Sequence, residues 1–247
     1  MSDLAIIGGT GLTSLAGLEI VRREVVSTPH GEASGPLIHG VFGGKQVVFL
    51  ARHGYAANIP PHRVNYRANV WAIQHIGVRK VVAVNAVGGI RPDLQHPGRL
   101  AIPDQIIDYT YSRGHTFFED GLAHVVHIDF TEPYCEALRA VLLEAARRAG
   151  LDVADRATYG ATQGPRLETS AEIDRLERDG CDVVGMTGMP EAALARELGL
   201  CYATCAVVAN AAAGRGPGAL SMEEIDRNLK SGMDSVRRLL AEAIPLI

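Results

Sequence analysis

Short apolar runs rich in valine, isoleucine and alanine alternate with amphipathic stretches along this chain, and no other feature constrains its fold as strongly. Runs of this kind, bounded by glycine, proline or aspartate, are typical of strands buried on both faces of a sheet. The predicted strands span 4–7, 46–51, 80–87, 100–107, 156–162, 181–186 and 200–208. Strands that alternate with helices predict an α/β fold in which a mixed central β-sheet is flanked by helices.

Helix signals lie between several of these strands. The predicted helices span 63–77, 132–150, 169–180, 190–199 and 221–243. The first two end in glycine, which is favoured just past a helix C-terminus. The third opens with Thr-Ser-Ala-Glu, so Thr169 and Glu172 can satisfy each other's backbone donors in a capping box. Because no repeat or long linker divides the 247 residues, the sequence predicts one domain over 1–247.

Charge and hydropathy argue against several partners. The chain carries 24 Lys and Arg residues against 28 Asp and Glu residues, a net charge of -4, and has no basic block. Nucleic acids and anionic membranes bind basic surfaces, so we expect neither as a partner. No apolar run approaches the roughly 18 residues of a membrane-spanning helix. The N-terminal residues lack the cationic and apolar regions of a signal peptide.

The four cysteines, Cys135, Cys181, Cys201 and Cys205, have neither the density nor the spacing of a disulfide framework or a zinc site. Cys201 and Cys205 lie in an apolar stretch, where buried thiols behave as small hydrophobic side chains. The cysteines therefore predict no bound metal and a protein of the reducing cytoplasm.

In an α/β fold the ligand binds beyond the carboxyl ends of the strands, so the loops there are the candidate site. The first predicted strand leads into Gly-Gly-Thr-Gly at 8–11, a turn that brings backbone N–H groups close to an anion. The second ends at Arg52 and His53, which can bind phosphate through a planar fork and a further donor. The third ends in Asn-Ala-Val-Gly-Gly at 85–89, whose glycines allow close approach of a ligand.

Each of these loops has an ordinary explanation when it is taken alone. The glycine turn fits neither the dinucleotide nor the Walker fingerprint, so it can be a tight strand exit. Arg52 can form a surface ion pair, and His53 can be a packed loop residue. Three loops with anion-binding chemistry are more persuasive than one, and together they predict a site for free phosphate.

Several longer stretches carry a family resemblance over nearly the whole chain. They are, in chain order, IIGGTGL (6–12), ARHG (51–54), VNYRANVWAI (64–73), NAVGG (85–89), PDQIIDYT (103–110), GPRLETSAE (164–172), GMTGMPEAALARELG (185–199) and AIPLI (243–247). In these stretches the chain resembles the trimeric nucleoside phosphorylases, which include purine nucleoside and methylthioadenosine phosphorylases. The resemblance implies a nucleoside phosphorylase-like fold, a homotrimer and a pentosyltransferase. It also implies that inorganic phosphate, as co-substrate, cleaves the purine–ribose bond without metal or organic cofactor.

The resemblance also implies roles for individual residues. The residues that match the family's phosphate site are Thr10, Arg52, His53, Asn85, Ala86 and Thr187. The residues expected to contact the nucleoside are Ala86, Leu167, Glu168, Met186, Asn210, Met222, Ile225 and His127. Ala86 contributes its backbone N–H, and Met186 matches a residue that packs on the ribose. Asn85 departs from methylthioadenosine phosphorylases, which have a threonine there, and agrees with purine nucleoside phosphorylases.

The base pocket is expected to select a 6-oxopurine. Glu168 matches a glutamate that accepts N1–H in purine nucleoside phosphorylases, whereas adenine presents a bare N1 lone pair that a carboxylate repels. Asn210 stands where adenine-specific members have an aspartate, and Ala212 replaces their second aspartate. Glu168 and Asn210 are the expected catalytic contacts, since Asn210 can donate to N7 or O6 as charge develops on the base. The competing interpretation is that Glu168 caps its own helix and Asn210 bonds to backbone.

The 5′ end of the ribose is expected to meet an apolar wall. Met222 aligns with a histidine in purine nucleoside phosphorylases and with an apolar residue in methylthioadenosine phosphorylases. Met222 and Ile225 lie one helical turn apart, so both can pack against a thioether. They can equally be core positions of the last helix. His127 matches a histidine that lines a neighbouring subunit's 5′ pocket, and Phe130 is a second candidate contact between subunits.

These expectations converge on phosphorolysis of S-methyl-5′-thioinosine to hypoxanthine and 5-methylthioribose 1-phosphate. A methylthioadenosine phosphorylase and an inosine or guanosine phosphorylase are the alternatives within the enzyme class. A nucleoside-binding module without turnover is the alternative outside it. The spacing of His124, His127 and Asp129 also allows a metal site, but no other motif converges on it. His115, Tyr109 and Tyr111 are candidates for a loop over the site.

Overall fold

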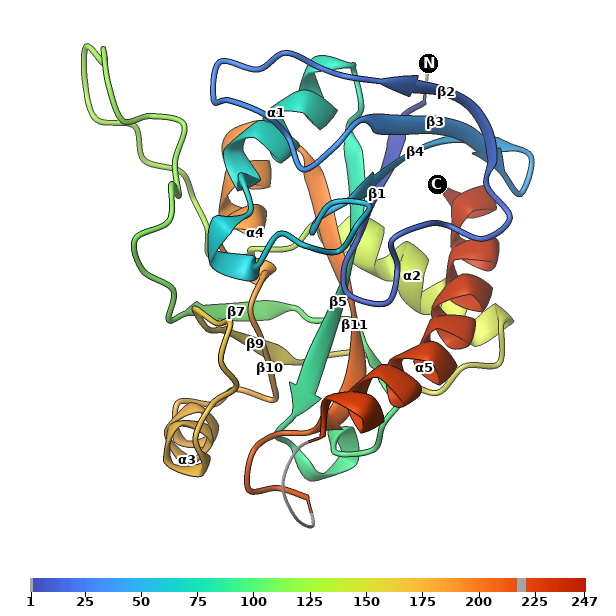
Figure 1. The fold of residues 1–247 in the computed structure, drawn as a ribbon, viewed down its shortest axis with the longest axis vertical. Coiled ribbons are helices and arrows are strands. Elements are labelled where there is room, and N and C mark those ends of the chain that lie inside the picture. Colours follow the sequence, from blue (N-terminus) through green and yellow to red (C-terminus); the bar gives the residue numbers. More distant parts are fainter. Residues whose placement is uncertain (1, 217–220) are drawn as a thin grey trace.

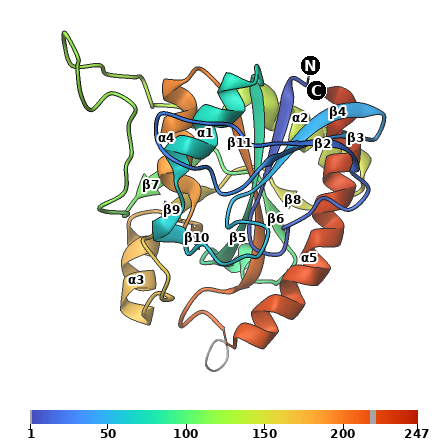
Figure 2. The same cartoon turned by 45° about the horizontal axis from the view of Figure 1, so that its top comes forward.

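The computed structural model describes residues 2–216 and 221–247. Within these residues, eleven strands form one mixed sheet between helices (Figures 1 and 2). The strands are β1 (Leu4–Gly8), β2 (Glu19–Glu24), β3 (Leu37–Phe42), β4 (Lys45–Ala51), β5 (Lys80–Gly89), β6 (Leu100–Ala101), β7 (Gln105–Asp108), β8 (Val153–Ala154), β9 (Thr158–Ala161), β10 (Val183–Gly185) and β11 (Cys201–Ala211). The predicted α/β fold with a mixed sheet flanked by helices is confirmed.

Helices cover both faces of the sheet. They are α1 (Tyr66–His75), α2 (Glu136–Arg148), α3 (Ser170–Arg178), α4 (Gly188–Glu197) and α5 (Met222–Ala243). Helices α1 and α4 cover one face, and α2 and α5 cover the other (Figure 2). Successive side chains of a strand point to opposite faces, so Val81 and Ala83 of β5 pack in the core beneath α1 and α4. Val82 and Val84 pack in the core beneath α2 and α5.

Strand β5 organises the sheet and creates a gap in it. One edge of β5 pairs with β11 along its whole length. The other edge pairs with parallel β1 only as far as Ala83, and with antiparallel β10 at Gly88 and Gly89. Between these partners, residues 84–87 face no other strand of the described chain on that edge. The gap opens beyond the carboxyl end of β1, where an α/β fold binds its ligand.

The predicted strands are found, but not all strands were predictable. The stretch 100–107 contains two strands, β6 and β7, separated by a segment that includes Pro103, which has no N–H for a ladder. Strands β2, β3 and β8 are absent from the sequence prediction. Strand β2 is an edge strand whose residues are mostly exposed and charged, and β8 has only two residues. Neither therefore shows the continuous apolar pattern of a buried strand.

The predicted helices are present with shifted ends. The capping box of α3 is confirmed, because Glu172 N donates to Thr169 Oγ1 at 3.1 Å and Thr169 N donates to the Glu172 carboxylate at 2.7 Å. Helix α1 begins at Tyr66 rather than at 63. The side chain of Asn65 caps it by accepting from Ala68 N at 3.1 Å, and a 3-10 turn precedes it at Pro61–Arg63.

The expectation of an unpaired cysteine set is wrong, because Cys135 and Cys201 form a disulfide. The two residues are 66 positions apart in sequence. Cys135 N donates to Tyr202 O at 2.8 Å, which brings the start of α2 against the start of β11. Spacing along the chain carries no trace of this long-range contact. Cys181 and Cys205 are buried free thiols, and burial raises their pKa values to about 11 and about 12.

A long segment without helix or strand leaves the body after β7 (upper left in Figure 1). We call residues 117–131 the arm. The arm is held at its start by Glu197, which accepts from Thr116 Oγ1 at 2.6 Å and Phe117 N at 2.7 Å, and at its end by Gln105 Nε2, which donates to Thr131 O at 3.1 Å. Residues 119–129 are all exposed. The exposed apolar side chains among them are Leu122, Val125, Val126 and Ile128.

None of the described helices is both long and apolar enough to cross a membrane.

Candidate active site

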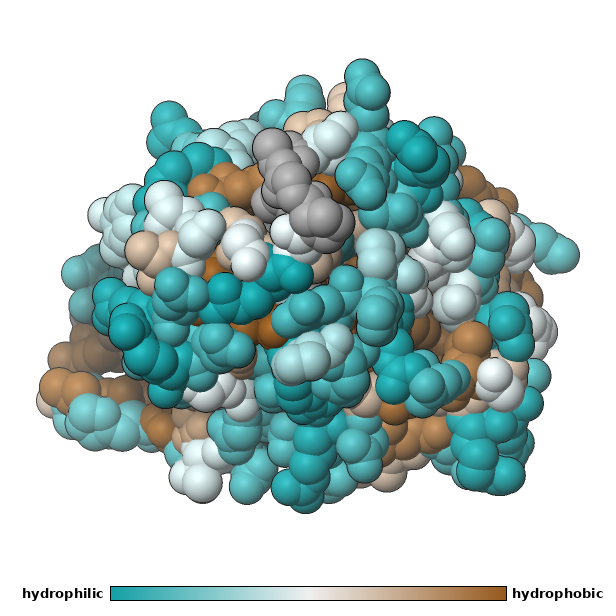
Figure 3. All heavy atoms as spheres, turned by 90° about the horizontal axis from the view of Figure 1, so that it is seen from below, coloured by the Kyte–Doolittle hydropathy of each residue, from teal (hydrophilic) through white to brown (hydrophobic). Residues whose placement is uncertain are grey.

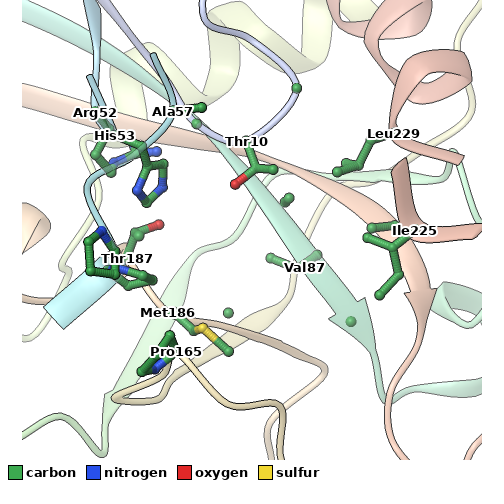
Figure 4. Close-up of a pocket in the computed structure, with 18 of the residues that line it drawn as sticks. Thr10, Arg52, His53, Ala57, Val87, Pro165, Met186, Thr187, Ile225 and Leu229 are labelled. Atoms are coloured by element: carbon green, nitrogen blue, oxygen red, sulfur yellow. The ribbon is translucent and has the colours of Figure 1, made fainter. Parts of the chain in front are cut away.

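A cavity of about 580 Å³ opens at the gap beside β5. Its walls come from the segments that follow β1, β4, β9 and β10, from β5 and β11 themselves, and from the start of α5. Figure 4 shows Arg52, His53 and Thr187 on one side of this cavity and Ile225 and Leu229 on the opposite side. Seen from below, the surface is mostly hydrophilic, and hydrophobic residues show in places between the hydrophilic ones (Figure 3).

The cavity brings together most residues that the sequence singles out. The predicted residues that line it are Thr10, Arg52, His53, Ala86, Leu167, Glu168, Met186, Thr187, Asn210, Met222 and Ile225. Asn85 and His127 are not among its lining residues in the described chain. The turn after β1 and the loop after β4 thus meet at this cavity, as the α/β pattern predicts. The third expected loop, 85–89, is not a loop, because it lies within strand β5.

The backbone of β5 offers an N–H group to the gap. Arg52 Nη1 donates to Val84 O at 3.0 Å, so Val84 directs its backbone groups toward the gap rather than toward β11. Residues two apart along a strand direct their backbone groups to the same edge, so the N–H of Ala86 also faces the gap. Gly9 packs against this edge, because a Cβ there would lie 2.5 Å from Val84 O and 2.8 Å from Arg52 Nη1.

Arg52 is fully buried and forms an ion pair with a buried carboxylate. The alternative that Arg52 forms a surface ion pair is therefore wrong. Its Nε and Nη2 donate to Glu191 Oε2 and Oε1 at 2.7 and 2.8 Å. Burial alone lowers the pKa of Arg52, but the Glu191 carboxylate outweighs burial and raises the pKa above its ordinary value. A guanidinium has five N–H donors, and Glu191 and Val84 take three. One N–H on Nη1 and one on Nη2 are left for an anion.

Glu191 is the main residue that the sequence analysis missed. It is fully buried in α4. Besides Arg52, it accepts a hydrogen bond from Tyr202 Oη at 2.8 Å, and Thr204 Oγ1 donates to that hydroxyl at 3.3 Å. A buried carboxylate needs such partners because desolvation of a charge is costly. The available signal was a single acid among apolar residues in GMPEAALA, and it does not reveal the partner.

His53 is neutral and has one free ring nitrogen. Its Nδ1 lies 2.8 Å from Ile59 O, which can only accept, so Nδ1 carries the proton. Burial, and after it the positive charge of Arg52, hold the pKa of His53 below its ordinary value. Nε2 of the neutral ring is then an acceptor, which can accept a hydrogen bond from a protonated anion such as hydrogenphosphate.

Asn85 is bonded to Thr187 and does not line the cavity. It is fully buried, and its Nδ2 donates to Thr187 Oγ1 at 2.8 Å. Thr187 precedes α4 and lines the cavity. The predicted contact between Asn85 and phosphate stays a prediction, and in this structure Asn85 bonds to a threonine that lines the cavity.

The Glu168 carboxylate lines the cavity, and a hydrogen bond fixes its orientation. Thr162 Oγ1 donates to Glu168 Oε1 at 2.6 Å. Glu168 does not cap α3, since that role belongs to Thr169 and Glu172. Asn210 follows a shift in the pairing of β11 with β5, and its Nδ2 donates to Ala211 O at 2.6 Å. The backbone contact expected for Asn210 in the competing interpretation is thus present, and the one for Glu168 is not.

The opposite end of the cavity is apolar. Ile225 is buried, whereas Met222 is 62% exposed in a single chain. Met222 is therefore not a core residue of α5. The interpretation of Met222 and Ile225 as core positions of this helix fails for Met222. Met186 lies beside Pro165 on the wall of the cavity (Figure 4).

The remaining candidates lie outside the cavity. His127 is exposed on the arm, and Phe130 lies near the arm's end. Tyr109 Oη donates to Asp179 Oδ2 at 2.7 Å beside α3, and Tyr111 is exposed to solvent. No group of three or more metal-ligating side chains occurs among the described residues, so His124, His127 and Asp129 do not form one there.

Comparison with known proteins shows what this chain is similar to. A model of the phosphorylase superfamily matches residues 3–245. A probable S-methyl-5′-thioinosine phosphorylase of Pseudomonas syringae pv. tomato is 53% identical over 244 residues, which cover 99% of each chain. A 6-oxopurine nucleoside phosphorylase of Pyrococcus furiosus is 46% identical over 252 residues, which cover 100% of this chain and 94% of that protein.

This chain is also similar in structure to solved proteins. The methylthioadenosine phosphorylase of Schistosoma mansoni, solved in complex with adenine, superposes with a TM-score of 0.94 at 33% identity. The superposition covers 100% of this chain and 92% of that one.

Proposed function

Because this chain belongs to the phosphorylase superfamily and is a pentosyltransferase of the purine nucleoside phosphorylase type, we propose that its substrate is S-methyl-5′-thioinosine. The products are hypoxanthine and 5-methylthioribose 1-phosphate. The observation that carries this proposal is one cavity with the Glu168 carboxylate at its base end and Met222 with Ile225 at its apolar end. The proposal takes residues 1–247 as one catalytic domain.

Phosphate occupies the end of the cavity formed by the turn after β1, the loop after β4 and the residues of β5 that face the gap. It accepts from the two unused N–H groups of Arg52, the N–H of Ala86 and the hydroxyls of Thr10 and Thr187. A hydrogenphosphate ion donates its proton toward Nε2 of His53, which the Ile59 carbonyl keeps free of hydrogen. Phosphate already carries the negative charge of a nucleophile, so no side chain needs to act as its base.

The protein then stabilises the departing base. The C1′–N9 bond breaks with its electron pair moving to the purine, a phosphate oxygen bonds to C1′, and the hydrogenphosphate proton ends on the purine. Glu168 accepts N1–H of the 6-oxopurine, with Thr162 fixing the carboxylate. Asn210 turns from the Ala211 carbonyl to donate to N7 or O6 as negative charge develops there. Leu167 and Met186 pack against the nucleoside.

The active assembly in this proposal is a homotrimer. Met222 is exposed in one chain, and the arm exposes Leu122, Val125 and Val126. Apolar surface of this kind is a feature of interfaces. A neighbouring copy that covered Met222 with His127 and Phe130 of its arm would complete the 5′ pocket. The proposal includes a cytoplasmic location and no metal or organic cofactor, since phosphate is the only co-substrate the chemistry requires. Sedimentation of the purified protein tests the trimer.

The decisive experiment compares three nucleosides at one phosphate concentration. S-methyl-5′-thioinosine, methylthioadenosine and inosine differ only at the base or at the 5′ group, so kcat/KM separates the two ends of the cavity. We expect methylthioinosine to exceed each of the others by roughly tenfold or more, because an unmatched buried polar group costs ~1–3 kcal/mol. A preference for methylthioadenosine would overturn the role of Glu168, and a preference for inosine would overturn that of Met222.

Two specific observations favour rival functions. The similarity to the Schistosoma mansoni structure favours a methylthioadenosine phosphorylase. The similarity to the Pyrococcus furiosus relative favours inosine or guanosine as substrate. The same three-nucleoside comparison decides between them. A nucleoside-binding module would release no free base when phosphate is added.

A further inference from the structure

Arg113 is a buried arginine at the root of the arm that serves none of the roles described above. It lies in a segment without helix or strand and is only 8% exposed. Its Nη1 donates to Met186 O at 2.8 Å and Met189 O at 2.7 Å, and its Nη2 donates to Gln163 O at 2.8 Å and Thr162 O at 3.2 Å. One side chain therefore binds four main-chain carbonyls from two separate segments.

Both segments carry groups that line the cavity. The carbonyls of Met186 and Met189 flank Thr187, at the phosphate end. The carbonyl of Thr162 belongs to the residue whose hydroxyl donates to Glu168 at 2.6 Å, at the base end. The segments are also joined directly, since Thr162 N donates to Gly185 O at 2.8 Å. Arg113 thus spans from the phosphate end to the base end without touching a ligand.

The charge of Arg113 is also unusual among the buried arginines. Arg52 is neutralised by Glu191, whereas no ion pair found in the described residues includes Arg113. Its charge is compensated by carbonyl dipoles, by Gln163 Oε1 at 3.1 Å and by the face of Tyr66, whose ring centre lies 5.5 Å from the guanidinium carbon. A buried positive charge at this place raises the potential in the neighbouring phosphate end.

We propose that Arg113 is a positioning residue for phosphorolysis, which fixes the positions of Thr187 and Glu168 relative to each other across the cavity. This inference rests on the proposed function, because it concerns the same site. A planar fork is required, since only two nitrogens at a fixed spacing can bind both carbonyl pairs together. Lysine supplies the charge from a single nitrogen and cannot span them.

Arg139 provides a matched control, because it is also buried and also binds main-chain carbonyls. It is 3% exposed, with donors to Pro103 O at 2.9 Å and Ile102 O at 3.3 Å and a further bond to Asp155 O. None of its partners lines the cavity. Substitution of Arg139 therefore costs stability in a similar way without disturbing Thr187 or Glu168.

The test compares Arg113→Lys and Arg113→Met with Arg139→Lys and Arg139→Met in the full-length protein. We expect kcat to fall by tenfold or more in both Arg113 variants, and to stay within twofold of wild type in both Arg139 variants below their Tm. Arg113→Lys should recover most of the Tm that Arg113→Met loses, while its kcat stays low. A kcat that recovers with Tm in Arg113→Lys, or that falls equally in the Arg139 variants, would overturn the proposal and leave a structural role.

A second readout separates this inference from the choice of substrate. Inorganic phosphate alone should raise the Tm of wild type, because a ligand that binds only the folded state stabilises it. We expect this rise to be smaller in both Arg113 variants and unchanged in both Arg139 variants. Equal rises in all five proteins would overturn the role of Arg113. If wild type fails to cleave methylthioinosine, the proposed substrate is wrong, and kcat ratios on inosine together with the phosphate readout still decide the role of Arg113.

Discussion

At the scale of single residues, the proposed phosphate end of the cavity depends on a buried charge pair. Arg52 and Glu191 are both fully buried, and their charges largely cancel. The main contribution of Arg52 to this end is therefore its two unused N–H donors, and not a net charge. Removing either partner strands the other charge in the interior, which is far more costly than losing the pair together.

Substitution Arg52→Ala should affect stability and phosphate use together. We expect a loss of about 3–5 kcal/mol in the free energy of unfolding, because Glu191 is left unpaired. The KM for phosphate should rise roughly tenfold to a hundredfold, the value of a hydrogen bond to a charged group, with little change in nucleoside affinity. The double variant Arg52→Ala, Glu191→Ala is the control, and should regain stability but not phosphate affinity. Equal weakening of phosphate and nucleoside would assign Arg52 a purely structural role.

The neutral state of His53 predicts a loss of stability in acid. Its pKa in the folded protein lies below the ordinary value of 6.5 because of burial and Arg52. Above pH 6.5 the ring is neutral in both states, so its contribution is fully present. As the pH falls from there through the folded pKa, the unfolded chain binds the proton first and stability is lost. In urea unfolding at several pH values, the free energy of unfolding should fall less steeply with decreasing pH in His53→Gln than in wild type. Part of the fall should remain, because the pKa values of His30 and His39 are also lowered.

Met222 sets the 5′ preference in the proposed pocket. Replacing it by histidine removes about two buried methylene-sized groups, each worth ~0.8 kcal/mol, and supplies a polar partner for a 5′-hydroxyl. We expect Met222→His to raise the kcat/KM ratio of inosine to methylthioinosine by about tenfold or more. Met222→Leu preserves the apolar wall and should leave the ratio within about twofold of wild type. An unchanged ratio in Met222→His would mean that the side chain does not meet the 5′ group.

At the scale of elements, the sequence is most informative where burial is continuous. Strands such as β5, buried on both faces, are evident from apolar runs, and the glycine turn after β1 lines the cavity where the sequence predicts a site. Edge strand β2 could not be recognised, because its exposed residues follow no burial pattern. Glu191, Thr162 and Arg113 were missed for a different reason. Glu191 and Arg113 act through contacts to residues far away in the sequence, and Thr162 bonds to Glu168 across a segment without helix or strand. Such contacts leave no periodic pattern.

The link between α2 and β11 gives a prediction at this scale. Without reductant, the unfolded chain should show two reactive thiols, from Cys181 and Cys205, and four after reduction. Reduction should lower the free energy of unfolding by up to about 4 kcal/mol, the loop-closure value for a closed loop of this length. Cys135→Ser with Cys201→Ser should behave as reduced wild type does, while Cys205→Ser retains the difference between the two redox states. Four thiols in protein that was never reduced would show that the bond does not form in solution.

At the scale of the whole molecule, the arm is the part that the packed body does not support. Two helices cover each face of the sheet, whereas residues 119–129 are exposed throughout (Figures 1 and 2). Arg113 lies just before the arm, so one short segment both binds the Met186–Met189 carbonyls and carries the surface proposed to meet a neighbour. Assembly and catalysis would then depend on the same stretch of chain.

An exposed segment that the packed body does not cover is where a protease first meets a folded protein. Between Arg113 and Arg139 the chain contains no lysine or arginine, so trypsin cannot cut the arm, whereas chymotrypsin can cut at Phe118, Leu122 and Phe130. Limited chymotryptic digestion therefore becomes a gauge of subunit association. Nicking of the arm should accelerate as the protein is diluted and copies separate, while tryptic digestion of the same samples leaves the arm whole. A nicking rate that does not change with protein concentration would mean that no second copy shields this segment.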